Sequence, residues 1–236
     1  MDAGQPAVGL RHGQGAAGVS EGVPAVSLVV FDLGRVLIRL CDGWQHACEL
    51  AGVKLPPGVL AVSDAERSRI EQLSGLVDTG AIDLATYARE IASLRGLLPD
   101  DILAIQDIFL RGPYPGAIEL LDELHAAGIQ TACLSNTHDY HWRQMLDPAG
   151  SNFLPIERMT YRFASHLVRT RKPLDAIYEH VERTTGLPPQ SILFFDDLEA
   201  NVAAAARRGW QVHRVTPCDD PIRAIRQRLR SQQILA

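Results

Sequence analysis

Short, continuous apolar runs alternate along this chain with longer segments in which apolar residues recur every three or four positions. The apolar runs lie within residues 26–31, 129–134 and 191–195, and a fourth strand is expected at 211–215 because that segment follows a helix that ends at Gly209. Such runs are typical of strands that are buried on both faces of a parallel sheet. The helical segments between and after them cover residues 116–127, 173–185, 199–208 and 219–231. This alternation predicts an α/β fold, a Rossmann-like doubly wound parallel sheet with right-handed crossovers.

Residues 41–112 show helical patterning only. Apolar residues recur there at helical spacing in two series, Leu84, Tyr87, Ala88, Ile91 and Leu94, then Ile102, Ile105, Ile108 and Phe109. Asp83 is suited to cap one of these helices and Pro99 to begin the next. We therefore expect a small all-helical cap at 41–112, without strands, inserted after the first strand of an α/β core that comprises 25–40 and 113–236.

The first 24 residues are rich in glycine and alanine and lack the apolar stretch of a secretory signal. We expect residues 1–24 to form a disordered N-terminal extension, because this composition buries too little apolar surface to fold.

Composition and charge narrow the functional classes. The 236 residues are 46% hydrophobic, which is enough for a core domain with a smaller insert. The formal net charge of −5 without a basic stripe argues against a nucleic-acid partner, and no apolar run is long enough to span a membrane. The cysteines show no metal-ligand or disulfide spacing, which is typical of a cytoplasmic protein. They are Cys41, Cys48, Cys133 and Cys218.

Polar residues stand where three of the apolar runs end. These residues are Asp32, Ser135, Asp196 and Asp197, and Lys172 stands in a comparable place before Pro173. Ligands of open α/β sheets bind outside the carboxyl ends of the strands, so these side chains are expected to meet in one crevice. Each alone is also compatible with a turn, a helix cap or a surface residue. Their joint placement favours a reactive site.

The chemistry of this set fits phosphoryl transfer. A carboxylate such as Asp32 can attack phosphorus and form an aspartyl-phosphate, which divides a difficult displacement into two easier ones. The carboxylate and the phosphate are both anions and repel, so the site needs a divalent cation, a lysine and hydroxyl donors. Asp197 would hold the cation, Lys172 would supply the second positive charge, and Ser135 would supply the hydroxyl. His138 and His141 have a spacing that also suits metal ligands, but no third ligand is evident, and we expect surface or interface residues.

Four segments, in this order, resemble motifs I to IV of the haloacid dehalogenase superfamily. They are FDLGRVL (31–37), LSNT (134–137), RKP (171–173) and FFDDLEAN (194–201). The helical insert resembles the cap of subfamily IA, and the Asp-Leu-Gly of the first motif is similar to that of bacterial sugar-phosphate phosphatases. The resemblance implies a magnesium-dependent phosphatase that hydrolyses small phosphorylated metabolites, such as sugar phosphates, through an aspartyl-phosphate.

The resemblance also implies roles for individual residues. Asp32 would be the nucleophile, with Ser135 and Lys172 as further catalytic residues. The implied ligands of Mg²⁺ are Asp32, Asp197 and the backbone carbonyl of Gly34. The implied supporting residues beside them are Asp196 and Asn201. Those implied to contact the phosphoryl group are Ser135, Asn136 and Lys172.

The chain departs from the commoner family pattern at two positions. Gly34 stands where most phosphatases of the superfamily carry a second Asp that acts as general acid and base, so substrates with poor leaving groups are expected to turn over slowly. Arg35 stands where a small residue is usual and would contact a substrate carboxylate or phosphate, or equally a cap carboxylate or solvent. A catalytically weakened member that binds a phosphorylated ligand or a protein partner is the alternative. A metal-free 2-haloacid dehalogenase fits less well, because that branch carries an aromatic residue at position 34.

Overall fold

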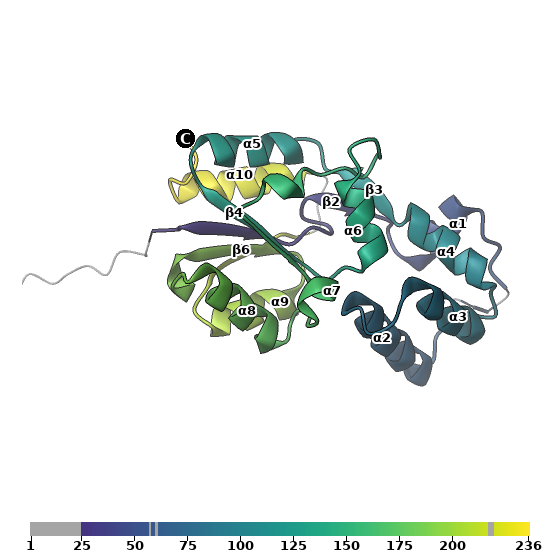
Figure 1. The fold of residues 1–236 in the computed structure, drawn as a ribbon. Coiled ribbons are helices and arrows are strands. Elements are labelled where there is room, and N and C mark those ends of the chain that lie inside the picture. The colour runs from purple at the N-terminus through teal and green to yellow at the C-terminus, as the bar shows by residue number, and fades with distance from the viewer. Residues whose placement is uncertain (1–24, 57, 60, 217–219) are drawn as a thin grey trace, which may run out of the picture.

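A five-stranded parallel sheet forms the centre of the molecule (Figure 1). In this computed structural model the described residues are 25–56, 58–59, 61–216 and 220–236, so the predicted extension at 1–24 and Cys218 lie outside them. The strands of this sheet are β1 (Leu28–Phe31), β4 (Gln130–Ser135), β5 (Tyr161–Ala164), β6 (Ile192–Asp196) and β7 (Gln211–Arg214). Their order is β5-β4-β1-β6-β7, which confirms the predicted α/β class.

Helices cover both faces of the sheet. Helices α5 (Ala117–Ala126) and α10 (Pro221–Ser231) lie on one face, and α8 (Asp175–Thr185) and α9 (Glu199–Arg207) on the other (Figure 1). Strand β1 shows why the strand runs are continuously apolar. Its alternate side chains Val29 and Phe31 enter one hydrophobic cluster, and Leu28 and Val30 enter the other.

Four further helices lie to one side of this core (Figure 1). They are α1 (Trp44–Ala51), α2 (Asp64–Asp78), α3 (Leu84–Arg95) and α4 (Pro99–Ile108), and they bury a hydrophobic cluster of their own. As predicted, the Asp83 carboxylate caps α3 by accepting a hydrogen bond from Thr86 N (2.7 Å), and α4 begins at Pro99. We refer to α1–α4 as the cap; its predicted domain boundaries stay a prediction.

The expectation of no strand within 41–112 is wrong at its C-terminal end. Strand β3 (Leu110–Pro113) pairs antiparallel with β2 (Ile38–Leu40), so a two-stranded ribbon joins the cap to the core. Neither strand exceeds four residues, and a Gly-Pro pair lies in β3, so neither has enough periodicity to be recognised without its partner.

Several elements between β4 and β6 were also not predicted. They are α6 (Asp139–Leu146), the 3₁₀ turns at Ile156–Arg158 and Pro189–Ser191, and α7 (Ser165–Val168), besides β5. Lys172 consequently follows α7 and does not stand directly after a strand. Across the described part of the chain, no helix has both the length and the apolar character to cross a membrane.

Candidate active site

Three carboxylates meet at the carboxyl ends of the two central strands. Asp32 follows β1, and its backbone N–H donates to the carbonyl of Phe195 in β6 (2.8 Å). Asp196 ends β6, and Asp197 follows it. One oxygen from each of these carboxylates lies within 4.8 Å of the others. Parallel pairing of β1 with β6 therefore brings together residues that are 164 positions apart in the chain.

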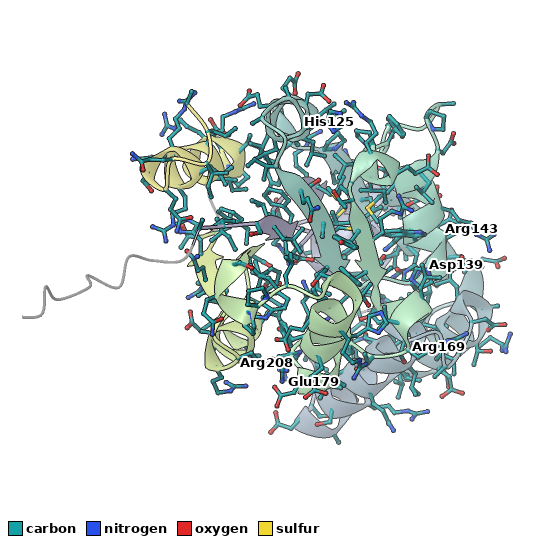
Figure 2. The ribbon with its side chains drawn as sticks, turned by 60° about the vertical axis from the view of Figure 1, so that its left-hand side comes forward. His125, Asp139, Arg143, Arg169, Glu179 and Arg208 are labelled. Carbon is teal, nitrogen blue, oxygen red and sulfur yellow. The ribbon has the colours of Figure 1, made fainter. Side chains whose placement is uncertain are left out.

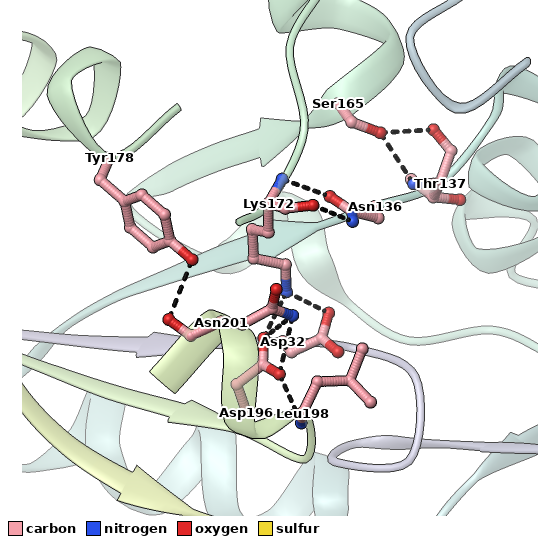
Figure 3. A network of polar contacts seen from close by, with 9 residues as sticks. All are labelled: Asp32, Asn136, Thr137, Ser165, Lys172, Tyr178, Asp196, Leu198 and Asn201. Carbon is pink, nitrogen blue, oxygen red and sulfur yellow. Dashed lines mark hydrogen bonds and ion pairs between the residues drawn. The ribbon is translucent and has the colours of Figure 1, made fainter. Parts of the chain in front are cut away.

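Lys172 lies between two of these carboxylates (Figure 3). Its Nζ is 2.9 Å from Asp32 Oδ1 and 2.6 Å from Asp196 Oδ2, and it lies 5.4 Å from the centre of the Phe194 ring. The side chain is 1% exposed. Burial alone would lower the pKa of Lys172, but the charges of Asp32 and Asp196 outweigh it, so the pKa is raised and the lysine is held in its charged form.

Hydrogen bonds hold the Asp196 carboxylate, the second partner of Lys172, in place. This carboxylate accepts hydrogen bonds from Leu198 N (2.8 Å) and from Asn201 Nδ2 (3.0 Å), and Tyr178 Oη in turn donates to the Asn201 carbonyl (3.0 Å). Asp196 is completely buried. Asp196 and Asn201, predicted as supporting residues, thus lie where they orient Lys172 toward Asp32 (Figure 3).

The negative charges of the other two carboxylates, Asp32 and Asp197, are only partly balanced by nearby positive charge. Burial raises the pKa of Asp32 to about 7; Lys172 opposes the rise, and the charge of Asp196 adds to it. Burial also raises the pKa of Asp197, again with a contribution from Asp196 and against an opposing charge on Arg35. No ion pair joins Asp197 to another residue that the structure describes. A cluster of hard oxygen donors short of positive charge suits a divalent cation such as Mg²⁺, held by Asp32 and Asp197.

Ser135 and Asn136 lie at the end of β4, and their predicted phosphate contacts stay a prediction. Ser135 is the buried last residue of that strand. The Asn136 side chain has another partner, because its Nδ2 donates to the Lys172 carbonyl and its Oδ1 accepts from the Lys172 N–H, both at 2.9 Å. Asn136 therefore holds the Lys172 backbone in place.

The two unusual residues of the first motif lie on different sides of the site. Gly34 lines a cavity of about 380 Å³ between core and cap, together with Ser135 and Asn136. Arg35 is exposed, has a φ of 57°, and does not line that cavity. Its positive charge acts on Asp197, whose pKa it lowers against the effect of burial.

The cap supplies the opposite wall of this cavity. Its side chains there include Trp44, Ser74, Asp78 and Tyr87. Burial raises the pKa of Asp78 to about 6, against the attraction of Arg171, whose Nη1 lies 3.5 Å from Asp78 Oδ2. These residues had no recognisable motif, since their place in the cavity depends on how the cap packs on the core.

His138 and His141 line the same cavity at the interface of α6 with the cap. His138 Nε2 lies 3.2 Å from Gln106 Oε1, and His141 Nε2 lies 2.8 Å from the Gln106 carbonyl. Burial lowers the pKa of His138 to about 2 and of His141 to about 4, so both rings are neutral. Both are interface residues, and the part of the chain that is described holds no metal-ligand group that includes them.

The parallel sheet and its buried Asp-Lys-Asp cluster define an α/β protein with charged side chains at the carboxyl ends of the strands, where such sheets bind their ligands. A model of the haloacid dehalogenase-like hydrolase family matches residues 29–209. The chain belongs to this family, as its four motifs predicted.

Curated relatives match it over part of their length. The chain is 24% identical over 213 residues to acyl-CoA dehydrogenase family member 10 of Mus musculus, covering 84% of this chain and 19% of that protein. It is 30% identical over 106 residues to protein CbbY of Rhodobacter capsulatus, covering 43% and 44%. The chain thus spans less than half the length of either relative.

Solved structures share the fold over nearly the whole described chain. A haloacid dehalogenase family enzyme of Bacteroides thetaiotaomicron matches with a TM-score of 0.70 and 21% identity, covering 86% of this chain and 99% of that one. A complex of that enzyme with magnesium and inorganic phosphate matches with a TM-score of 0.62 and 22% identity, covering 82% and 96%. L-2-haloacid dehalogenase of Xanthobacter autotrophicus matches with a TM-score of 0.54 and 21% identity, covering 89% and 85%.

Proposed function

We propose that this protein is a magnesium-dependent phosphatase that hydrolyses small phosphorylated metabolites through an aspartyl-phosphate on Asp32. The observation that carries the proposal is the position of Lys172, whose Nζ lies 2.9 Å from Asp32 and 2.6 Å from Asp196. A lysine held charged beside a buried carboxylate favours the approach of a phosphate dianion to that carboxylate. The magnesium and phosphate in the enzyme of Bacteroides thetaiotaomicron are consistent with this chemistry.

The reaction has two displacement steps. In the first, an Asp32 oxygen attacks phosphorus while the bond to the leaving alkoxide breaks, which forms an acyl phosphate. In the second, water attacks phosphorus and releases inorganic phosphate and the free carboxylate. Lys172 and the Ser135 hydroxyl would stabilise charge on the phosphoryl oxygens.

The metal would be held by Asp32, Asp197 and the carbonyl of Gly34. Mg²⁺ supplies positive charge that lets a phosphate dianion approach the three carboxylates. Lys172 then positions the nucleophile, Asp32. Asp196, Asn201 and Asn136 in turn hold Lys172 in place.

Gly34 points to the substrate class. A glycine provides no side chain to protonate the leaving group, so good leaving groups are favoured, among them hexose 1-phosphates and aryl phosphates. This is consistent with the sugar-phosphate phosphatase branch. We propose that the protein is cytoplasmic and acts on a small phosphorylated metabolite. We propose no nucleic-acid partner and no membrane partner.

The same glycine supports the alternative, a weakened family member that binds a phosphorylated ligand or a protein partner. Hydrolysis of an aryl phosphate with and without magnesium separates the two. Activity that survives complete chelation, particularly on 2-haloacids, would instead favour the dehalogenase branch.

The nucleophile is tested with Asp32→Asn. The amide has nearly the same shape but is a far poorer nucleophile, so we expect turnover to fall by at least about 10³-fold while the fold persists. Acid-quenched wild-type protein should carry phosphate on Asp32 by mass spectrometry. The control is Asp122→Asn, which removes an exposed carboxylate on α5 and should leave turnover unchanged. Undiminished turnover in Asp32→Asn would refute the mechanism.

A further inference from the structure

A second cavity lies within the cap itself. It has a volume of about 200 Å³ and is bounded by α1, α2, α3 and the segment that precedes α2. Its lining residues are Trp44, Val62, Ile70, Tyr87, Ile91 and Arg95. All but one of them are apolar or aromatic. The charged side chain, Arg95, is the last residue of α3 and is 6% exposed.

Arg95 has no acceptor for its donors. No hydrogen bond or ion pair joins its guanidinium to any other residue within the described ranges. The nearby Glu66 carboxylate interacts with Arg95 only through charge, and its Oε2 accepts from Ser63 N (2.9 Å) and Ser63 Oγ (2.6 Å) in the capping box of α2. Although Arg95 is only 6% exposed, none of its nitrogens is among the fully buried atoms without a partner, so the guanidinium keeps a small accessible surface at which an acceptor can bind.

Trp44 contributes only an aromatic wall to this cavity. Its indole Nε1 has no hydrogen-bond partner among the described residues, but the atom is fully buried and therefore not open to a ligand in the cavity. The remaining walls, from Val62, Ile70 and Ile91, offer only apolar surface. A positively charged donor in an otherwise apolar cavity favours a ligand with an anionic acceptor and an apolar body.

We propose that this cap cavity binds a small apolar carboxylate. The carboxylate accepts hydrogen bonds from Arg95, and the apolar body packs against Trp44, Ile70 and Ile91. A cavity of ~150 Å³ holds a benzene ring, so this one is large enough for a ring that carries a carboxylate. None of the residues proposed to act on phosphate lines the cavity, so the site goes beyond the proposed function and does not depend on it.

The test measures binding of three probes to the full chain by calorimetry. Benzoate has both the ring and the charge, benzamide keeps the ring without the charge, and acetate keeps the charge without the ring. We expect benzoate to bind at least about tenfold more tightly than either of the others, since a hydrogen bond to a charged group and the burial of a ring each contribute at least that factor. Equal affinity for benzoate and benzamide overturns the proposal.

Arg95→Met assigns the preference to its residue. Methionine keeps the apolar stem but removes the charge, so the preference for benzoate over benzamide should disappear. Arg89→Met is the matched control, because Arg89 lies on the same helix with its side chain exposed, and the preference should persist. A preference that survives in Arg95→Met overturns the proposal.

Measurements of stability guard against misfolding. Arg95→Met should not lower Tm in the absence of ligand, because it removes a largely buried charge that has no hydrogen-bond partner among the described residues. Benzoate should raise the Tm of the wild type only, and a benzoate-induced rise of Tm in Arg95→Met contradicts the assigned site.

Discussion

At the scale of single residues, one lysine holds the candidate active site together. Lys172 is buried between Asp32 and Asp196, so it offsets the repulsion of two carboxylates that the sheet brings to the same point. Removing one member of a buried ion-paired group leaves uncompensated charge, which is more unfavourable than replacing the whole group. The site is therefore sensitive to this position in both stability and chemistry.

We expect Lys172→Met to lower the free energy of unfolding by about 3–5 kcal/mol near neutral pH, and by less near pH 5.5. The difference arises because protonation of Asp32, whose pKa is already raised by burial, relieves the repulsion at the lower pH. Urea unfolding in chelator at the two pH values measures it. The control is Lys54→Met, the same change at an exposed lysine. A loss of stability that is equal at both pH values would contradict this account.

Gly34 permits a direct test of the missing acid. A Cβ at this position would lie 3.0 Å from Leu40 Cδ1, the end of a flexible side chain, and the backbone φ is not positive. Leu40, and not the exposed Arg35, is thus the neighbour that must adjust. We expect the wild type to favour aryl and sugar 1-phosphates over primary alkyl phosphates, and Gly34→Asp to raise kcat/KM on alkyl phosphates by up to about 10²-fold. Gly34→Asn, which adds similar bulk without an acid, should not. Equal wild-type rates on both substrate types would mean that another group supplies the proton.

At the scale of elements, the sequence predicted what is encoded locally. Apolar runs located β1, β4 and β6, because strands buried on both faces tolerate few polar residues. Strand β7, which reads QVHR and is only partly buried, was located by its place after a helix that ends at a glycine. Strand β5 was missed because its four residues include Tyr161 and Arg162 and are ordered by pairing with β4. The contact of Asn136 with the Lys172 backbone joins positions 36 apart and depends on how two loops meet, which no local pattern encodes.

The junction of α2 with α7 is another contact of this kind. Arg169 Nη1 donates to the carbonyl of Gly80 (2.5 Å), and Ser165 Oγ donates to that of Asp78 (2.6 Å). Figure 2 shows Arg169 at the border between the core and the cap. The carbonyl of Asp78, the last residue of α2, lacks an intrahelical partner and is satisfied by Ser165, while Arg169 binds the carbonyl of Gly80 in the loop that follows the helix. Both bonds connect the cap to the core.

We expect Arg169→Ala to lower the free energy of local opening at this junction by about 1 kcal/mol. This corresponds to about fivefold faster amide exchange at the C-terminal end of α2. Hydrogen-exchange mass spectrometry measures this locally. Arg162→Ala is the control, because Arg162 donates to the Glu157 carbonyl within the core and should leave α2 unaffected. Equal effects of the two variants on α2 would argue against a specific junction.

At the scale of the whole molecule, the carboxylate cluster couples stability to pH and to metal. The pKa of Asp32 in the folded state is about 7, against 3.8 as its ordinary value, because burial outweighs the attraction of Lys172. The folded state therefore binds a proton that the unfolded state has lost between about pH 4 and 7. Without metal, this group's contribution to stability is present at acid pH and declines as the pH rises through about 7.

Magnesium should offset much of this decline, since a cation held by Asp32 and Asp197 competes with the same protons. A tenfold gain in affinity from about pH 5.5 to pH 8 adds about 1.4 kcal/mol at saturating metal, or about 3–6 °C in Tm for a protein of this size. We therefore expect millimolar magnesium chloride to raise Tm more at the higher pH, as measured by thermal unfolding with and without chelator. In Asp32→Asn, which carries no titrating group at this position, the magnesium-induced shift should be small and nearly independent of pH. A wild-type shift that is the same at both pH values would mean that metal binds away from Asp32, because only a site that includes this carboxyl exchanges its proton for the cation.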